Sequence, residues 1–311
     1  MQAGDVVLQL SSAYNMVKNT LTFLSTFEGI QVVTVPVVFP GKGLPPTGIM
    51  NQTLLGAIEA ALSSYPHSKL LVISHITSVP AAIFPVEDVA RLCQQHGIPT
   101  LVDGAHALGH IPVDIGALSA AGVDFWIGNG HKWLYSPKGT AVLWTSKAYQ
   151  AGVVPTVISS EYGETYLDHF EYTGTRDYSS FCAIGAALDF RKGLGEEEIL
   201  DWNVKLAHWG EGYLAGLWET EVLLPQEMTG MMSHPRLPAA IQNVKQMQWL
   251  AGSLLSDYGI YAVLFNLVNP ETSQETFWVR LSAQIYLEQA DIITFGNAVL
   301  ELIPKIPPSL Q

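Results

Sequence analysis

The chain has 311 residues, of which 48% are hydrophobic and only 14% are charged. This composition predicts a well-filled core without long disorder, either in one large domain plus a smaller one or in two medium domains. The net charge is −13, and the sequence has neither a basic stripe nor a polybasic run. Nucleic acid and anionic membrane surfaces are therefore not expected partners.

The sequence also argues against export. No apolar stretch reaches the roughly 20 residues that a membrane span needs, and the first residues lack the charged and apolar regions of a secretory signal. Only two cysteines, Cys93 and Cys182, occur, which is too few for a disulfide framework. We therefore expect a cytoplasmic protein.

The first half of the chain alternates short apolar runs with helical patterns. In chain order, the pattern predicts a strand at 5–10, a helix at 14–27, a strand at 30–38, a loop at 40–46, a helix at 51–63, a strand at 70–74, a helix at 86–96, and strands at 100–103, 125–128 and 140–144. Apolar strands separated by helices predict an α/β fold with a mostly parallel sheet buried on both faces. The chemistry of such a sheet lies at the carboxyl ends of its strands.

From about residue 181 the pattern changes to longer helices. It predicts helices at 182–192, 196–218, 238–259 and 289–303, with a strand at 278–281. We place a domain boundary near residue 195. This gives a large domain over 1–195 and a smaller C-terminal domain over 196–311.

Two short polar motifs follow predicted strands. Asp103 opens the run Asp-Gly-Ala-His, which ends at His106, and Lys132 closes the run Gly-Asn-Gly-His-Lys. Lys132 follows Asp103 by 29 residues, about the length of a helical crossover between strands of one sheet. Each residue alone has an ordinary explanation, since an aspartate at a strand end often caps a helix and a loop lysine is often solvated. Their combination after two apolar strands favours a site.

These residue types are the ones that pyridoxal 5′-phosphate (PLP) chemistry requires. A lysine amine forms a Schiff base with PLP, and an acid keeps the pyridine nitrogen protonated, so that the ring accepts electrons from the substrate Cα. We predict Lys132 as the Schiff-base lysine and later the acid/base at Cα, and Asp103 as the partner of the pyridinium. No metal site is predicted.

Two further segments sharpen this prediction, Tyr-Thr-Gly-Thr-Arg-Asp at 172–177 and Val-Arg-Leu-Ser-Ala-Gln-Ile-Tyr at 279–286. With the two motifs above, the chain resembles the class V aminotransferase family of fold-type I PLP enzymes, in particular its isopenicillin N epimerase-like and cysteine desulfurase-like branch. The resemblance runs from about residue 4 to 302. It implies a large domain with a mostly parallel, seven-stranded-type sheet flanked by helices, and a smaller C-terminal α+β domain.

The resemblance also implies roles for further residues. Tyr14 would stack on the PLP ring, although a half-buried helix aromatic is an equally good explanation. Ser78 would contact the phenolate oxygen of PLP or the substrate, and His106 would hydrogen-bond that phenolate. Arg280 would bind the substrate α-carboxylate through two parallel hydrogen bonds, the alternative being a strand-edge ion pair.

Three residues are implied in binding the PLP phosphate. Asn129 and His131 would donate hydrogen bonds to it. Thr175 would reach the phosphate of the neighbouring subunit, which implies a homodimer with shared active sites. The resemblance starts almost at the first residue, so we expect a shortened N-terminal part, without the helix that cradles the phosphate in the family.

The implied activity is that of a PLP-dependent enzyme acting at Cα or Cβ of an amino acid, through an external aldimine and a quinonoid. We expect a lyase or a Cα-carbanion reaction, either epimerisation or carbon–carbon bond formation, in secondary metabolism. Residues 261–276 contain no cysteine, which disfavours the persulfide mechanism of a desulfurase. An aminotransferase and a shortened, non-catalytic binding or dimerisation protein stay open. A Rossmann-type dehydrogenase ranks last, because Gly-x-Gly-x-x-Gly is absent.

Overall fold

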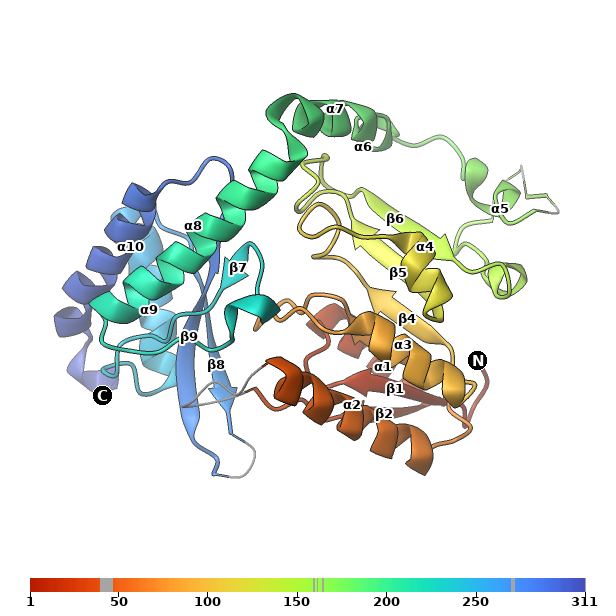
Figure 1. Ribbon diagram of the computed structural model, residues 1–311, viewed down its shortest axis with the longest axis horizontal. Helices are drawn as coiled ribbons and strands as arrows, with labels where there is room; N and C mark the ends of the chain where they lie inside the picture. The colour runs from red at the N-terminus through yellow and green to blue at the C-terminus, as the bar shows by residue number, and fades with distance from the viewer. Residues whose placement is uncertain (40–46, 159, 161, 164, 270–271, 311) are drawn as a thin grey trace. The chain divides into compact units, whose positions relative to one another are not determined.

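The computed structural model describes residues 1–39, 47–158, 160, 162–163, 165–269 and 272–310 (Figure 1). The loop predicted at 40–46 lies outside the described residues. The chain forms two compact units. Residues 1–35, 55–76 and 85–194 make up the first, and residues 36–54, 77–84 and 195–311 make up the second. The two-domain division at residue 195 stays a prediction, since two earlier segments group with the second unit.

A six-stranded sheet forms the centre of the first unit. Its strands are β1 (Val6–Leu10), β2 (Gln31–Val35), β3 (Leu70–Ser74), β4 (Thr100–Asp103), β5 (Val123–Asn129) and β6 (Ala141–Thr145), in the order β2-β1-β3-β4-β5-β6. All neighbours run parallel except β5 and β6. The whole of β3 is buried, as its continuous apolar sequence requires. The predicted mostly parallel sheet is confirmed, with six strands in the described residues where a seven-stranded type was expected.

Helices cover this sheet. They are α1 (Asn15–Glu28), α2 (Thr47–Ser64), α3 (Val86–Gln95) and α4 (Ile115–Ala120). Helix α1 contacts β2, α3 contacts β3 and β4, and α4 contacts β5. Helix α1 ends at Gly29, whose φ of 73° is the left-handed conformation that glycine adopts without penalty. The sequence pattern missed α4, a helix of six residues that Asp114 caps by accepting a hydrogen bond from the Ala117 N–H.

Three further helices end the first unit. They are α5 (Asp168–Glu171), α6 (Ser179–Cys182) and α7 (Ile184–Leu194). The single helix predicted at 182–192 is therefore wrong at its start, because Cys182 closes one short helix and Ile184 begins the next. None of the helices among the described residues combines the length and apolarity needed to cross a bilayer.

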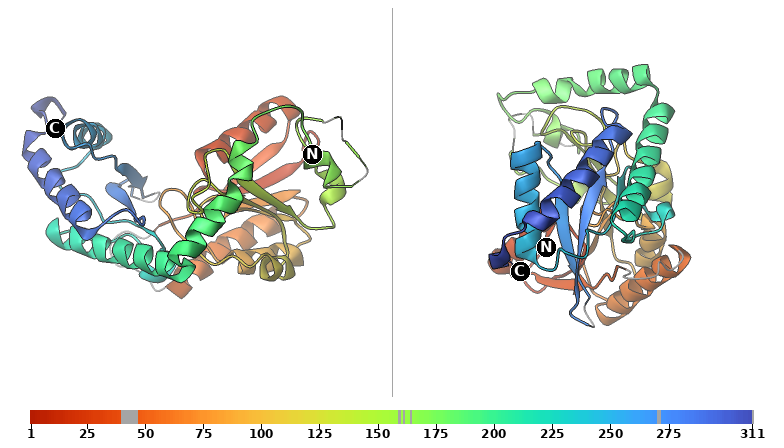
Figure 2. Two further views of the ribbon diagram at one scale, coloured as in Figure 1. Left: turned by 90° about the horizontal axis from the view of Figure 1, so that it is seen from above. Right: turned by 90° about the vertical axis from the view of Figure 1, so that its left-hand side faces the viewer.

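The second unit packs three helices against a small antiparallel sheet. The helices are α8 (Glu196–Leu217), α9 (Val244–Tyr258) and α10 (Gln289–Leu302), and the sheet runs β7 (Met232–Ser233), β9 (Glu275–Ser282), β8 (Val263–Val268). Helix α10 contacts both α8 and α9 (Figure 2). Short 3₁₀ turns lie at Gln150–Gly152 in the first unit, and at Gln226–Met228, Ile303–Lys305 and Pro308–Leu310 in the second.

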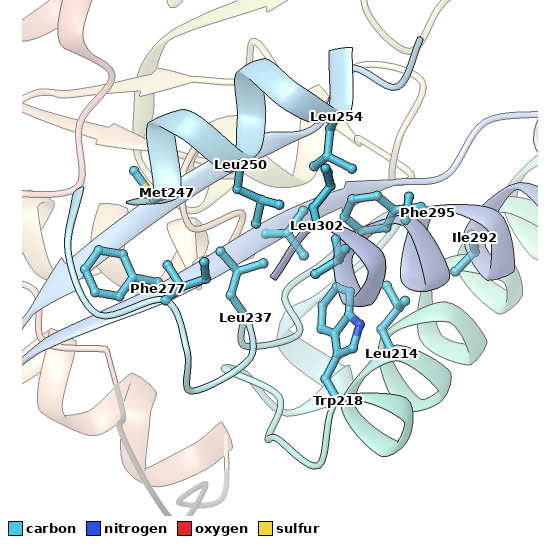
Figure 3. Close-up of a cluster of buried hydrophobic side chains, with 14 of the residues drawn as sticks. Leu214, Trp218, Leu237, Met247, Leu250, Leu254, Phe277, Ile292, Phe295 and Leu302 are labelled. Carbon is cyan, nitrogen blue, oxygen red and sulfur yellow. The ribbon is translucent and has the colours of Figure 1, made fainter. Parts of the chain in front are cut away.

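Apolar side chains from these elements meet in one core. Leu214 of α8, Leu250 of α9, Phe277 of β9 and Phe295 of α10 are all buried in it (Figure 3). The helix predicted at 238–259 begins only at Val244, where the preceding Asn243 side chain accepts a hydrogen bond from the backbone of the first turn. The sequence pattern missed β8, which pairs with β9 along its whole length.

One buried indole determines where glycine is required in the first unit. The Trp126 side chain of β5 is only 2% exposed. A Cβ atom on Gly104 would lie 2.3 Å from its ring, and one on Gly128 would lie 2.4 Å from it. Glycine at both positions therefore lets the backbone after β4 and within β5 approach the indole.

We expect Gly104→Ala to destabilise the protein by about 1–3 kcal/mol, because the added methyl overpacks a rigid ring. Gly56→Ala is the matched control. Gly56 lies within α2 and a Cβ atom there meets nothing within 4 Å, so alanine should stabilise by about 0.5–1 kcal/mol through its higher helix propensity. Urea unfolding measures both, and equal effects of the two changes would contradict the packing argument.

Candidate active site

The predicted polar motifs lie at the carboxyl ends of two neighbouring parallel strands. Asp103 is the last residue of β4 and pairs with Ile127 of β5. Asn129 is the last residue of β5, and Lys132 follows in the turn beyond it. Because parallel neighbours end at the same edge of a sheet, this pairing brings the two motifs together.

Three of the predicted residues meet at this edge. Lys132 Nζ lies 3.1 Å from Nε2 of His106. It also lies 5.8 Å from the centre of the Tyr14 ring. Tyr14 stands at the N-terminus of α1 with 46% of its surface exposed, so its ring is available to a planar group.

Asp103 is held in place by the backbone that follows it. Its Oδ1 accepts a hydrogen bond from the Ala105 N–H at 3.0 Å. Burial raises the pKa of Asp103, while the Ala105 N–H and the positive charge of Lys132 act in the opposite direction. A buried carboxylate of this kind is stabilised by a cationic partner.

Trp133 and Arg191, which the sequence did not single out, organise the turn around Lys132. The Trp133 indole N–H donates to Nδ1 of His106 at 3.3 Å, and Arg191 of α7 donates to the Trp133 carbonyl. Arg191 also donates to the Gly109 carbonyl at 3.1 Å, and its guanidinium lies 4.9 Å from the Tyr135 ring centre. The sequence offered no signal for Arg191, because a lone arginine on a helix is usually solvated.

The residues predicted to bind phosphate occupy different surroundings. His131 Nδ1 lies 3.1 Å from the Thr140 carbonyl, which can only accept, so Nδ1 carries a proton. His131 can therefore donate to an anion through Nε2 only when its ring is doubly protonated. Thr175 is exposed, and its hydroxyl lies 3.3 Å from that of Tyr172.

The remaining two predicted residues lie in the second unit and contact each other. Nη1 of Arg280, on β9, donates to the Ser78 carbonyl at 2.9 Å and lies 3.4 Å from the Ser78 hydroxyl. His234 holds the same segment in place, because its Nε2 accepts from the Ala81 N–H at 2.8 Å. Burial, together with the nearby charge of Arg280, lowers the pKa of His234 to about 3. The ring therefore stays neutral and keeps this bond.

The buried carboxyl of Glu211 lies next to the backbone of His234. Glu211 of α8 is only 2% exposed. Burial raises its pKa to about 7, although the His234 backbone N–H and the Gln226 side chain act in the opposite direction. Sequence reasoning missed Glu211 and His234, because neither lies in a motif.

We expect Arg191→Met to destabilise the protein by about 2–4 kcal/mol, because it keeps the bulk of the side chain but leaves the buried Trp133 carbonyl and the partly buried Gly109 carbonyl without their donor. Arg91→Met is the matched control. Arg91 lies on α3 with 52% of its side chain exposed, and pairs with Glu87 and Asp88, so its loss should cost at most about 1 kcal/mol. Urea unfolding compares the two. Equal losses would show that Arg191 does not hold the turn.

Glu211→Gln should change how stability depends on pH. The folded-state pKa of Glu211, about 7, lies above the ordinary value of 4.5. Its stabilising contribution is therefore complete below the ordinary value and is lost as pH rises through about 7. Glutamine mimics the protonated form and does not titrate. The unfolding free energy of the variant, measured relative to that of wild type, should therefore rise by about 2–3 kcal/mol when the pH is raised from about 5 to about 8.

Denaturant unfolding of both proteins at the two pH values measures this difference. Glu197→Gln, on the exposed surface of the same helix, is the matched control. If the difference in unfolding free energy between wild type and Glu211→Gln does not change with pH, the raised pKa of Glu211 is contradicted.

Comparison with known proteins identifies the family. The model of the family "Aminotransferase class-V" matches residues 44–261. An L-cysteine desulfhydrase-like protein, lolT1 of Epichloe uncinata, is 30% identical over 97% of this chain and 75% of its own length. "Putative L-cysteine desulfhydrase 1" of Oryza sativa subsp. japonica is 29% identical over 96% of this chain, and the chain spans 64% of that protein's length.

Solved structures show the same fold. The cysteine desulfurase CsdA of Escherichia coli aligns with a TM-score of 0.74 at 19% identity, over 99% of this chain and 74% of that one. The α/β architecture is therefore that of a fold-type I PLP enzyme. On the extent of the family match and the identity to its relatives, the chain belongs to the PLP-dependent class V aminotransferase family.

Proposed function

We propose that this chain holds PLP on Lys132 and cleaves a carbon–sulfur bond of cysteine or an S-substituted cysteine. One observation carries the proposal. The Lys132 amine lies 3.1 Å from His106 at a sheet edge that also bears Asp103 and the exposed ring of Tyr14. The names of the relatives at 29–30% identity, "Putative L-cysteine desulfhydrase 1" and "L-cysteine desulfhydrase-like protein lolT1", support the choice of bond.

The donor set at this edge fits PLP. Lys132 supplies the amine, and the buried Asp103 supplies an anion that gains from a cationic partner. Ser12, just beyond β1, has a buried hydroxyl with no hydrogen-bond partner among the described residues, so a polar group of a ligand would satisfy it. When bound, PLP supplies an electron-accepting ring conjugated with the substrate Cα.

Each residue then has a defined task. Lys132 would hold the cofactor through Nζ and later take the Cα proton, while Asp103 would keep the ring nitrogen protonated and Tyr14 would cover one ring face. His106 would donate to the ring oxygen. In the second unit, Arg280 would bind the substrate carboxylate, with Ser78 fixing the orientation of its guanidinium.

Asn129, His131 and Thr175 would hold the phosphate. His131 would do so through Nε2, because its Nδ1 is engaged with the Thr140 carbonyl. The exposed position of Thr175 is compatible with a reach into a neighbouring subunit. The proposal therefore includes a homodimer in which each chain completes the site of the other.

The burial of Cys93 and the lack of cysteine in residues 261–276 favour release of sulfide over its transfer to a protein thiol, whereas Cys182 is exposed. Cys93 is buried in α3, and burial raises the pKa of its thiol to about 11, so it is a poor nucleophile. Residues 261–276 contain no cysteine. Elimination needs no such thiol, because the leaving sulfur departs from Cβ as hydrosulfide. The products from cysteine and water are then pyruvate, ammonia and hydrogen sulfide.

Other reactions expected from the sequence share the first proton removal. Epimerisation or carbon–carbon bond formation, as in isopenicillin N epimerase-like proteins, would return or replace the proton at Cα, and transamination would move it to the cofactor. The names of the relatives favour elimination over these outcomes.

The cofactor claim is tested by absorption spectroscopy with added PLP. Wild type should show a visible band that borohydride abolishes, and Lys132→Ala should lack it, because only a lysine amine can form the linkage. Lys69→Ala, an exposed lysine ahead of β3, should keep the band. If wild type has no band, or if Lys132→Ala keeps it, the PLP assignment fails and the non-catalytic alternative takes its place.

The reaction claim is tested by product analysis with L-cysteine. We expect pyruvate and sulfide in equal amounts, and a loss of at least about 1,000-fold in rate for Lys132→Ala. Alanine together with protein-bound persulfide would indicate a desulfurase instead. Racemised cysteine would indicate an epimerase.

A further inference from the structure

Trp133 follows Lys132 directly and donates to the histidine beside it. Its side chain is only 4% exposed, and its indole N–H reaches Nδ1 of His106 at 3.3 Å. An indole N–H can only donate, so Nδ1 of His106 acts as the acceptor and carries no proton in this contact.

The other ring nitrogen of His106 then has a fixed role. A neutral imidazole carries one proton, which the Trp133 contact assigns to Nε2. Nε2 is the atom that lies 3.1 Å from Lys132 Nζ. A neutral amine accepts this hydrogen bond through its lone pair, whereas an ammonium would place two donors against each other.

We propose that Trp133 is a positioning residue that fixes His106 in its Nε2–H tautomer and thereby favours the neutral, nucleophilic amine of Lys132. The consequence for catalysis rests on the proposed function, in which this amine must attack a carbonyl. The tautomer itself follows from the two contacts alone.

Two neighbours of Lys132 act in the opposite direction. Asp103 interacts with the lysine charge, and the Tyr14 ring lies 5.8 Å from Nζ. A carboxylate and an aromatic face both favour an ammonium. The N–H of His106 opposes both of these effects, because it donates to the neutral amine.

The indole is held so that it cannot turn away. Its ring lies 4.5 Å from that of His110, and burial lowers the pKa of His110 to about 3, so that ring stays neutral. Arg191 donates to the Trp133 carbonyl. A Cβ atom on Gly109 would come within 2.7 Å of the same carbonyl, so glycine at this position lets the two backbone segments approach each other.

Nitrogen-15 NMR of the histidine rings tests the tautomer in the full chain without added cofactor. His106 is assigned by the signal that disappears in His106→Gln. We expect Nε2 of His106 to carry the proton and Nδ1 to carry none. A wild-type protein with the proton on Nδ1 would overturn the proposal, and this result needs no tryptophan variant to fold.

Trp133→Phe removes the donor and keeps a ring against His110. We expect the His106 signals to move towards a mixture of tautomers. Trp218→Phe is the matched control, because its buried indole N–H also donates a hydrogen bond, to the Gly296 carbonyl at 3.2 Å, but lies in the second unit. It should leave His106 unchanged. If His106 of Trp133→Phe stays entirely in the Nε2–H tautomer, Trp133 does not fix the tautomer and the proposal is wrong.

The reactivity of Lys132 provides a second readout that a purely structural role would not change. Reductive methylation at one near-neutral pH, followed by peptide mass spectrometry, compares Lys132 with Lys69 in each protein. We expect Lys132 of Trp133→Phe to react about threefold to tenfold more slowly, the effect of one hydrogen bond. An unchanged ratio would contradict the proposal. Neither readout uses PLP, so failure of the proposed function and failure of this inference are distinguishable.

Discussion

The parallel pairing of β4 with β5 is the constraint on which the site depends. Because both strands end at one edge, Asp103 and the turn that bears Lys132 start from fixed positions only one strand apart. The pairing in turn requires the Trp126 ring to fit beneath Gly104 and Gly128, where no Cβ has room. Packing inside the sheet thus determines where the chemistry can lie.

The polar groups of the candidate site are held by partners that can only donate a hydrogen bond. Asp103 accepts from a backbone N–H, and His106 accepts from an indole. Such partners cannot exchange roles with their neighbours, as hydroxyls and waters can. The orientation of each group is consequently fixed before any ligand arrives, which is what electrostatic preorganisation requires.

The sequence predicted the fold class, because apolar periodicity is a local pattern, and it singled out three residues whose roles in the site stay predictions. Apolar runs marked the strands, and polar residues after those runs marked Asp103, His106 and Lys132, two of which are in direct contact. The parts it missed depend on long-range contacts. The contacts of Arg191 with Trp133 and Gly109 span 58 and 82 residues, and nothing local distinguishes this arginine from a solvated one.

The misplaced boundaries have local causes that the apolar pattern does not report. The helix expected from residue 238 starts at Val244, because the Asn243 side chain competes for the first-turn backbone and marks the start. The small helix α4 was missed because six residues carry too little periodicity to be recognised. The domain division near residue 195 and the roles of the site residues stay predictions.

The two compact units are interleaved along the chain, since residues 36–54 and 77–84 group with the residues after Leu194. During synthesis the segment with Ser78 and Ala81 leaves the ribosome long before His234 and Arg280, the side chains that fix it. A nascent chain therefore carries this segment without its partners until most of the protein has been made. For the same reason, no single cut of the chain separates the two compact units.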